Sequence, residues 1–267
     1  MQYVQRNILG VVTTLSILFV MANSWSMPIT KHNLESIKTM SYGILKAKDN
    51  FGAPIQLVWE EVDVTTKRLN DVFRQASQIF AQTYATMELE FARKHPEAVE
   101  SEMFLKPLVS FFKDGVEHVN WEQVEKTLHA QLVQFFSETD FAKYLAPDER
   151  QWFVTAKDAD TGQTLGIIQF LVQPLFESGT VKVAMFGVEQ GAHERGIDKL
   201  LLSAIFKLPF SVSRIFLHTR VTNVALLCAL QELDFTPFVG PLPYWQDMEY
   251  LCERSEQLQN IAKSIEG

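Results

Sequence analysis

The stretch FGVEQGAHERGIDKLLLSAI, residues 186–205, decides how the chain is interpreted, because its pattern changes within a few positions. An apolar run ends at Glu189, a segment with two glycines follows, and apolar residues then recur at helical spacing from Ile197. The pattern predicts a strand, a tight turn and a helix over about 194–207. The free N–H groups at a helix start favour phosphates, but Asp198 puts an acid in the first helical turn.

The rest of the chain extends this strand–turn–helix unit into an α/β fold with a mixed central sheet and flanking helices. Period-two patterns predict strands over 55–63, 151–173 (two strands around an Asp-Thr-Gly turn), 180–189, 213–221 and 245–253. Three- and four-residue spacing predicts helices over 69–91, 97–113 (interrupted at Pro107), 120–136 (capped by Asn120) and 223–235 (capped by Asn223). The polar tail, 255–267, is a further helix candidate.

Composition limits the classes of function. The chain has 267 residues, 47% of them hydrophobic, which is ordinary for a globular protein of one or two domains. Its net charge of −8 and its lack of Lys/Arg clusters argue against general binding to nucleic acids. The scattered histidines and the pair Cys228 and Cys252 show no metal-ligand spacing, so no metal is expected. Two buried free thiols are expected, with a disulfide after export as the alternative.

The N-terminus predicts export. Residues 1–26 contain Arg6, a short apolar run at 8–22 and then small residues, which is typical of a secretory signal peptide. The run is shorter than the ~20 residues of a membrane span, although an uncleaved anchor or a buried helix are alternatives. Residues 27–54 are expected to form an irregular lead-in that ends in the turn KDNFGAP.

Residues 181–235 together resemble the GNAT superfamily of N-acetyltransferases. That family has the pattern Q/R-x-x-G-x-G/A on a strand–turn–helix, followed by a strand, an Asn and a helix that ends in a Leu-Gly-Phe-like element. Here His193, Glu194, Arg195, Gly196, Ile197 and Asp198 fall on the first pattern, and Asn223, Leu233 and Phe235 fall on the second. The resemblance implies a divergent GNAT-like domain over 55–254, with an enlarged helical segment, about 95–146, between the first and second strands.

The resemblance also implies a binding mode for acetyl-CoA as a co-substrate. Phe186, Gly187 and Val188 would pair with the pantetheine arm, the backbone from His193 to Asp198 would hold the pyrophosphate, and Asn223 would orient the cofactor or only cap its helix. Direct attack of an amine on the thioester needs a base and a proton donor. Glu189 is the first candidate for the base, His218 is a weaker one, and Tyr244 is a candidate proton donor.

Several residues depart from the family pattern. His193 replaces a Gln or Arg, and Asp234 replaces the usual Gly. Asp198 replaces a Gly or Ala and would repel a pyrophosphate, unless it turns outward to pair with Arg195 or Lys199. Leu230 stands where many members have a Tyr that protonates the thiolate.

The resulting expectation is an acyl-CoA-dependent N-acyltransferase that transfers acetyl to an amine-bearing small molecule or protein. The alternative is a non-catalytic GNAT-fold binding or interaction protein that has lost its cofactor. The predicted export conflicts with the cytosolic supply of acetyl-CoA. Delivery into another cell, anchoring with a cytoplasmic domain, or loss of the cofactor would each resolve this conflict.

Overall fold

The structure is a computed structural model that describes residues 42–63, 68–141, 150–172, 179–208, 211–238 and 243–266. The predicted signal peptide or anchor, 1–26, lies outside these residues. Within the described ranges, no helix is long and apolar enough to cross a membrane.

One mixed sheet organises the chain, with the strand order β1-β2-β3-β4-β5-β6-β8-β7. Neighbouring strands are antiparallel except β5 and β6, which are parallel. The strands are β1 (Tyr42–Lys48), β2 (Pro54–Asp63), β3 (Arg150–Asp158), β4 (Thr164–Val172), β5 (Thr180–Val188), β6 (Arg214–Arg220), β7 (Thr236–Phe238) and β8 (Trp245–Leu251).

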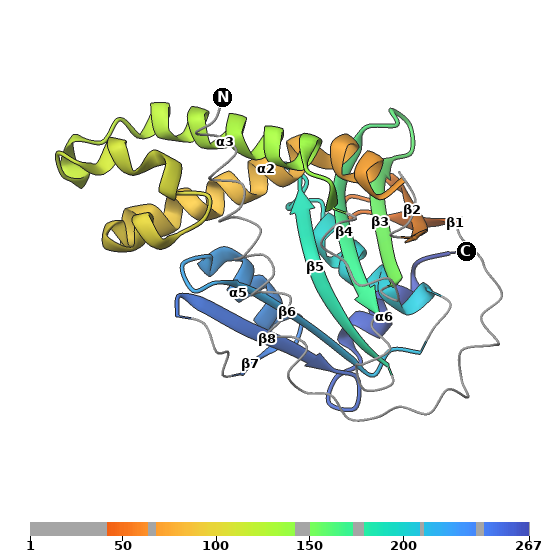
Figure 1. The fold of residues 1–267 in the computed structure, drawn as a ribbon. Coiled ribbons are helices and arrows are strands. Elements are labelled where there is room, and N and C mark those ends of the chain that lie inside the picture. Colours follow the sequence, from red (N-terminus) through yellow and green to blue (C-terminus); the bar gives the residue numbers. More distant parts are fainter. Residues whose placement is uncertain are drawn as a thin grey trace.

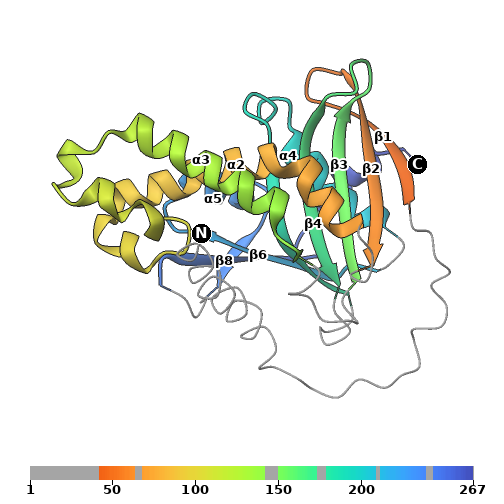
Figure 2. The ribbon, with the colours of Figure 1, turned by 45° about the horizontal axis from the view of Figure 1, so that its top comes forward.

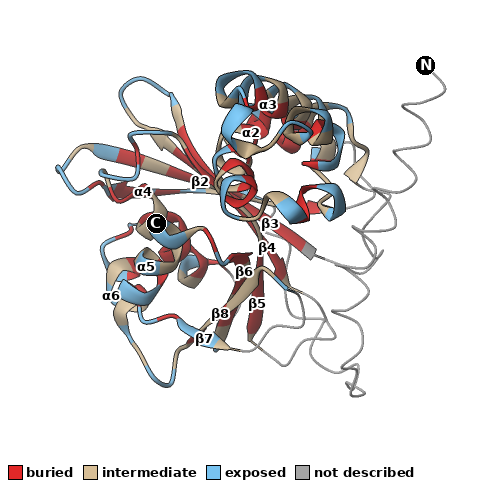
Figure 3. Cartoon of the chain, turned by 90° about the vertical axis from the view of Figure 1, so that its left-hand side faces the viewer, coloured by how far each residue is buried: buried red, intermediate tan, exposed pale blue. Residues whose placement is uncertain are grey.

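Helices cover both faces of this sheet (Figures 1 and 3). The long helix α2 and its partner α3 form an antiparallel pair that continues past the edge of the sheet (Figure 2), and α4 and α6 pack on the opposite face. The α-helices are α2 (Arg68–Lys94), α3 (Trp121–Glu138), α4 (Ile197–Ala204), α5 (Val224–Glu232) and α6 (Gln257–Lys263). Each face of the sheet buries its own apolar cluster, as its alternating side chains require.

The predicted fold class, a mixed sheet with flanking helices, is confirmed, but its first strand was missed. Residues 42–48, expected in an irregular lead-in, form β1, which pairs with β2 along its whole length. The turn predicted at KDNFGAP therefore closes a hairpin, in which Asp49 accepts hydrogen bonds from the N–H groups of Phe51 and Ala53. The enlarged helical segment consequently follows the second strand rather than the first.

The predicted helices differ from the observed ones in the middle of this segment. Residues 97–113, expected to be one interrupted helix, form the short 3₁₀ turns η3 (Pro96–Ser101) and η4 (Lys106–Phe112), followed by η5 (Val116–His118). Pro96 is the first residue of η3 and Pro107 the second residue of η4, positions that suit proline because it lacks an N–H for a continuous helix. The prediction for Asn120 is confirmed, since its side chain accepts from the N–H of Gln123 and caps α3.

The remaining elements of the C-terminal half are short. The helix predicted from about 194 begins at Ile197 and ends in the 3₁₀ turn η7 (Ile205–Lys207). The sequence patterns gave no sign of β7, which pairs with β8 over three residues, and the polar tail forms α6.

Candidate functional site

The strands β5 and β6 form a fork. They pair in parallel only at Thr180, Val181 and Lys182, and beyond these residues they spread apart (Figure 1). A β-bulge supports the divergence, because Ala184 is an extra residue opposite the pair Gln169 and Phe170 of β4. From Val183 to Val188, the described residues provide no partner strand on the β6 side of β5. We call this divergence the strand fork.

Helix α2 lies against β5 at the fork. A Cβ atom built on Gly187 would lie 3.0–3.3 Å from Ile79, Phe80 and Thr83 of α2, so this position has room for little more than a glycine. The hydroxyl oxygen of Thr83 is buried beside Gly187 and has no hydrogen-bond partner in the described part of the chain. The unpaired hydroxyl therefore lies between α2 and the face of β5, at a residue whose β6-facing edge has no partner strand among the described residues.

The glycine turn, residues 189–196, connects β5 to α4 and uses several of its own N–H groups. The N–H of Arg195 donates to the carbonyl of Ala192 at 3.2 Å, and the N–H of Gly196 donates to the carbonyl of His193 at 2.9 Å. Gly196 caps α4 in a left-handed conformation, φ 72°, and a Cβ there would lie 2.6 Å from Asn50. The positive φ and the nearby Asn50 side chain both favour glycine at this position, whatever the turn binds.

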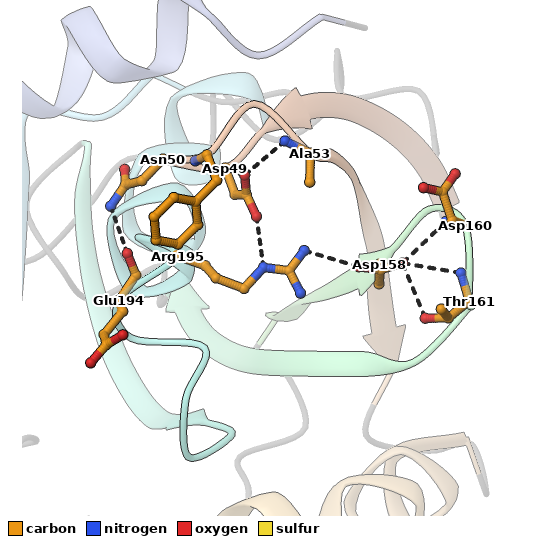
Figure 4. Close-up of polar contacts among 9 residues, drawn as sticks. Asp49, Asn50, Ala53, Asp158, Asp160, Thr161, Glu194 and Arg195 are labelled. Carbon is orange, nitrogen blue, oxygen red and sulfur yellow. Dashed lines mark hydrogen bonds and ion pairs between the residues drawn. The ribbon is translucent and has the colours of Figure 1, made fainter.

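Arg195 joins this turn to two hairpins (Figure 4). Its Nε donates to Oδ2 of Asp49 at 2.6 Å, and its Nη2 donates to Oδ2 of Asp158 at 2.9 Å. Asn50 strengthens the attachment, because its N–H donates to the carbonyl of Arg195 and its side-chain amide donates to the carbonyl of Glu194. We call Arg195, Asp49 and Asp158 the Arg195 ion-pair cluster.

The charges in this cluster stabilise one another. The hydrogen bond from Arg195, followed by those from Thr161, lowers the pKa of Asp158 to about 2. Burial alone would raise the pKa of Asp49, but hydrogen bonds from Arg195, Ala53 and Phe51 lower it below the ordinary value. The same contacts raise the pKa of Arg195. All three groups are therefore ionised at neutral pH.

Asp198 does not pair with Arg195. Pairing with Arg195 or Lys199 was the expectation for an outward orientation of this carboxylate. Its Oδ1 accepts the backbone N–H of Lys199 at 2.9 Å, so the carboxylate stays at the start of α4. The remaining residues of the predicted cofactor-binding segment are near one another. Ile197 and Val188 are buried, Phe186 is half-buried, and His193 and Glu194 are exposed on the turn.

The predicted catalytic residues lie on both arms of the fork. Glu189 follows β5 and is half-buried, whereas His218 lies on β6 and Tyr244 directly precedes β8. Within the described residues, no hydrogen bond joins Glu189 to either of the others. Burial, followed by the charge of Lys182, lowers the pKa of His218 to about 4, so its imidazole is neutral at physiological pH.

Tyr244 has a strained backbone, with φ at 64°. Its carbonyl accepts from the N–H of Val221, and its ring lies 4.8 Å from that of His95 and 5.3 Å from that of Phe91. Asn223 caps α5, because its side chain accepts from the N–H of Leu226 and its amide donates to Thr219. Both ends of Asn223 are therefore occupied.

Two expectations about α5 have different outcomes. Leu230 stands where the resemblance would place a Tyr. It is buried, and its side chain has no polar group. Cys228 was expected to be buried, but it is exposed, because α5 buries only Leu230 and leaves Val224 52% exposed. Cys228 and Cys252 are both free thiols.

Sequence reasoning missed a buried ion cluster beside the fork. Arg220, at the end of β6, binds Glu88 of α2 at 2.9 Å and Glu102 at 2.6 Å. Its guanidinium lies between the rings of Phe91 and Trp245, at 4.1 and 4.3 Å from their centroids. Burial raises the pKa of Glu88, and Arg220 opposes this effect. No local pattern marks these residues, since they come from distant parts of the chain.

Other parts of the described chain offer weaker candidates. A cavity of about 260 Å³ lies on the helical pair α2–α3, away from the glycine turn, and is lined by Gln82, Ala85, Glu122, Glu125, Lys126 and His129. In the ranges that the structure describes, no group of three or more His, Cys, Asp or Glu side chains is placed to hold a metal ion.

Comparison with known proteins gives likenesses in structure but not in sequence. No family model and no curated protein sequence matches the chain. Among solved structures, it is similar to the GNAT domain of PAT from S. lividans, with a TM-score of 0.41 and 11% identity over 78% of this chain and 96% of that one. A variant of the spermidine N-acetyltransferase SpeG from Vibrio cholerae has a TM-score of 0.33 and 15% identity over 52% and 77%. Ard1 from Thermoplasma volcanium has a TM-score of 0.33 and 17% identity over 37% and 69%.

These likenesses are partial, and none of the three TM-scores reaches 0.5. Two of the structures are described as an N-acetyltransferase and a GNAT domain, which is the kind of protein that residues 181–235 resemble. The functional proposals below therefore depend on the contacts of this chain.

The strand fork fits a pantetheine arm, but the glycine turn does not fit a diphosphate in the arrangement observed. The free edge of β5 offers backbone partners to an extended chain that carries amides. At the turn, by contrast, the one arginine is already paired with two carboxylates, and Asp198 remains at the helix start. The two halves of the predicted cofactor site therefore differ in their chemistry.

Proposed function

We propose that the chain is an N-acyltransferase that takes an acyl group from a pantetheine thioester, with acetyl-CoA as the expected donor, and transfers it to an amine. The observation that supports this most is the free edge of β5 between Val183 and Val188, at the fork from β6. An extended donor on this edge would pair with the backbone N–H and C=O groups of β5 that have no partner strand among the described residues.

Glu189 supports the chemistry, because it directly follows this edge and lies at the mouth of the fork. In the proposed reaction, the amine nitrogen forms a bond to the thioester carbonyl carbon, and the carbon–sulfur bond then breaks. Glu189 accepts the proton that the amine loses, directly or through a water molecule, and the leaving thiolate takes up a proton. Tyr244 and His218 are the other candidates for moving protons.

The acceptor that we propose is an amine on a small molecule or a protein. The site of action is an exported or membrane-anchored one, because residues 1–26 have the pattern of a signal peptide. N-terminal sequencing tests this part of the proposal, since a cytosolic product that still begins at Met1 would contradict it.

The role of Glu189 gives the first prediction. Glu189→Gln should lower kcat by about 100-fold or more, because a general base contributes at least this much, while the affinity for the thioester changes little. Release of free thiol from acetyl-CoA or acetyl-pantetheine, with a panel of amines, measures the rate. Glu194→Gln is the matched control, since it removes an exposed carboxylate from the same turn. Equal rates for the parent and Glu189→Gln would exclude Glu189 as the base.

A second candidate function is a non-catalytic binding protein with the same fold. The Arg195 ion-pair cluster favours it, because the turn is attached to two hairpins through its only arginine. Thermal unfolding with added thioester distinguishes the two functions. A donor that binds only the folded state should stabilise it by ~2.7 kcal/mol at a hundredfold excess over its Kd. If neither acetyl-CoA nor acetyl-pantetheine raises the Tm, the result favours the non-catalytic function.

A further inference from the structure

The surroundings of the glycine turn are acidic. Three segments meet there, namely the turn itself with the start of α4 (189–199) and the two hairpin turns at 48–53 and 157–163. Their acids are Asp49, Asp158, Asp160, Glu189, Glu194 and Asp198, and their bases are Lys48, Lys157, Arg195 and Lys199. Acids outnumber bases, so the segments together repel an anion.

The cationic group best placed for a phosphate is also occupied. Arg195 reaches its two aspartates at 2.6 and 2.9 Å, and 24% of its side chain is exposed. A diphosphate that used this guanidinium would have to displace at least one carboxylate, or approach the site beside both. The N–H of Lys199, in the first turn of α4, already donates to Asp198. The turn thus satisfies internally the N–H groups of Arg195, Gly196 and Ile197, which are half of the six from His193 to Asp198 that would otherwise face a phosphate.

The strand fork has the opposite chemistry, because its partners are neutral. Backbone groups on the β6-facing edge of β5, which has no partner strand among the described residues, can hydrogen-bond to amides, and they need no charge on the ligand. The pantetheine arm of a thioester carries such amides, and its nucleotide end carries the phosphates. The two ends of coenzyme A therefore meet surroundings of different kinds.

We propose that this site recognises its acyl donor through the pantetheine arm alone, so that its substrate class is acyl-pantetheine thioesters with or without a nucleotide. The proposal rests on the acyltransferase function proposed above and changes its substrate class. The diphosphate of acetyl-CoA adds no affinity, because Arg195 remains paired with Asp49 and Asp158. A donor without phosphates is then at least as good a substrate.

Titration of the full chain with two donors tests this inference. Acetyl-pantetheine and acetyl-CoA should bind with Kd values within about threefold of each other, and adenosine 3′,5′-bisphosphate should not compete with acetyl-pantetheine. Tighter binding of acetyl-CoA by about tenfold or more would overturn the inference and leave the acyltransferase function in place. If neither thioester binds, the acyltransferase function fails, and the donor assignment fails with it.

A double variant tests the physical cause. Asp49→Asn with Asp158→Asn keeps the hairpin acceptors but releases the charge of Arg195, so acetyl-CoA should gain about tenfold over acetyl-pantetheine. Asp160→Asn is the matched control, because it removes the same charge from one of these hairpins without contacting Arg195, and it should leave the ratio unchanged. An unchanged ratio in the double variant would show that the ion-pair cluster does not exclude the diphosphate.

Discussion

Arg195 lies between two aspartates that come from different hairpins, so its charge is balanced before any ligand arrives. The same contacts attach the glycine turn to the β1–β2 and β3–β4 hairpins and give the turn a fixed shape. A single side chain thereby has two consequences, since it stabilises the turn and removes the positive charge that a phosphate would need.

The second of these aspartates gives a prediction for the pH dependence of stability. The folded-state pKa of Asp158, about 2, lies below the ordinary value of 3.8, so its contribution to the free energy of unfolding is fully present above that ordinary value. The contribution is lost as the pH falls from about 4 to about 2. The difference in urea midpoint between the parent and Asp158→Asn should therefore be constant from pH 7 to 5 and shrink below pH 4. Asp160→Asn is the control, because it removes the same charge from this hairpin without contacting Arg195. A difference for Asp158→Asn that keeps its full neutral-pH size down to pH 2 would contradict the ion pair.

At the scale of elements, α5 begins at a cap that the sequence indicates and the structure contains. Asn223 accepts the N–H of Leu226 and donates to Thr219, so it fixes the start of the helix to the end of β6. This arrangement explains the residue without a ligand, although the family resemblance assigns it a role with the cofactor.

Two substitutions separate these roles. Asn223→Ala should lower the free energy of unfolding by about 1 kcal/mol, because it leaves an N–H at the helix start without its partner. Asn223→Asp should keep most of this stability, since Asp is an equally good cap and its charge suits the helix start. Chemical denaturation measures both effects. A loss of thioester binding in the stable Asn223→Asp protein would show that Asn223 does orient the donor.

Elements with a strong local signal were predictable, and contacts between distant segments were not. The period of α2, the cap of α3 and the Asp-Thr-Gly turn between β3 and β4 are all visible within a few neighbouring residues. β1 was missed because only Leu45 and Ala47 alternate with exposed lysines, and its pairing with β2 stabilises it.

The candidate site also combines features that were predictable from local sequence with contacts that were not. The glycine turn and its helix were predicted from residues 186–205, because their signal is local. The partners of Arg195 were not predicted, since Asp49 and Asp158 lie 146 and 37 positions away in the sequence. A one-dimensional pattern shows that Asp158 begins a turn, but it does not show which cation that turn meets.

At the scale of the whole molecule, the pair of helices α2 and α3 extends past the sheet (Figures 1 and 2), and α2 lies against β5 at the fork. Arg220 connects the two parts, because it joins the end of β6 to Glu88 of α2 and to Glu102, which follows η3. The side chain of Arg220 is 2% exposed, and its Nη1 has no partner in the described part of the chain. The position of α2 against the fork therefore depends on a charge cluster that is removed from water.

The final prediction compares two arginines on the same strand. Arg220→Ala should lower the free energy of unfolding by about 3–5 kcal/mol, because the buried Glu88 and the partly buried Glu102 would remain without a counter-charge. Arg214→Ala should cost about 0–1 kcal/mol, since Arg214 pairs with Glu249 at a half-exposed position of β6. Adding Glu88→Gln to Arg220→Met should recover part of the loss, because one of the two uncompensated charges is then absent. Urea denaturation of the four variants measures these differences, and equal losses for the two single alanine variants would show that the cluster does not hold the helical pair to the sheet.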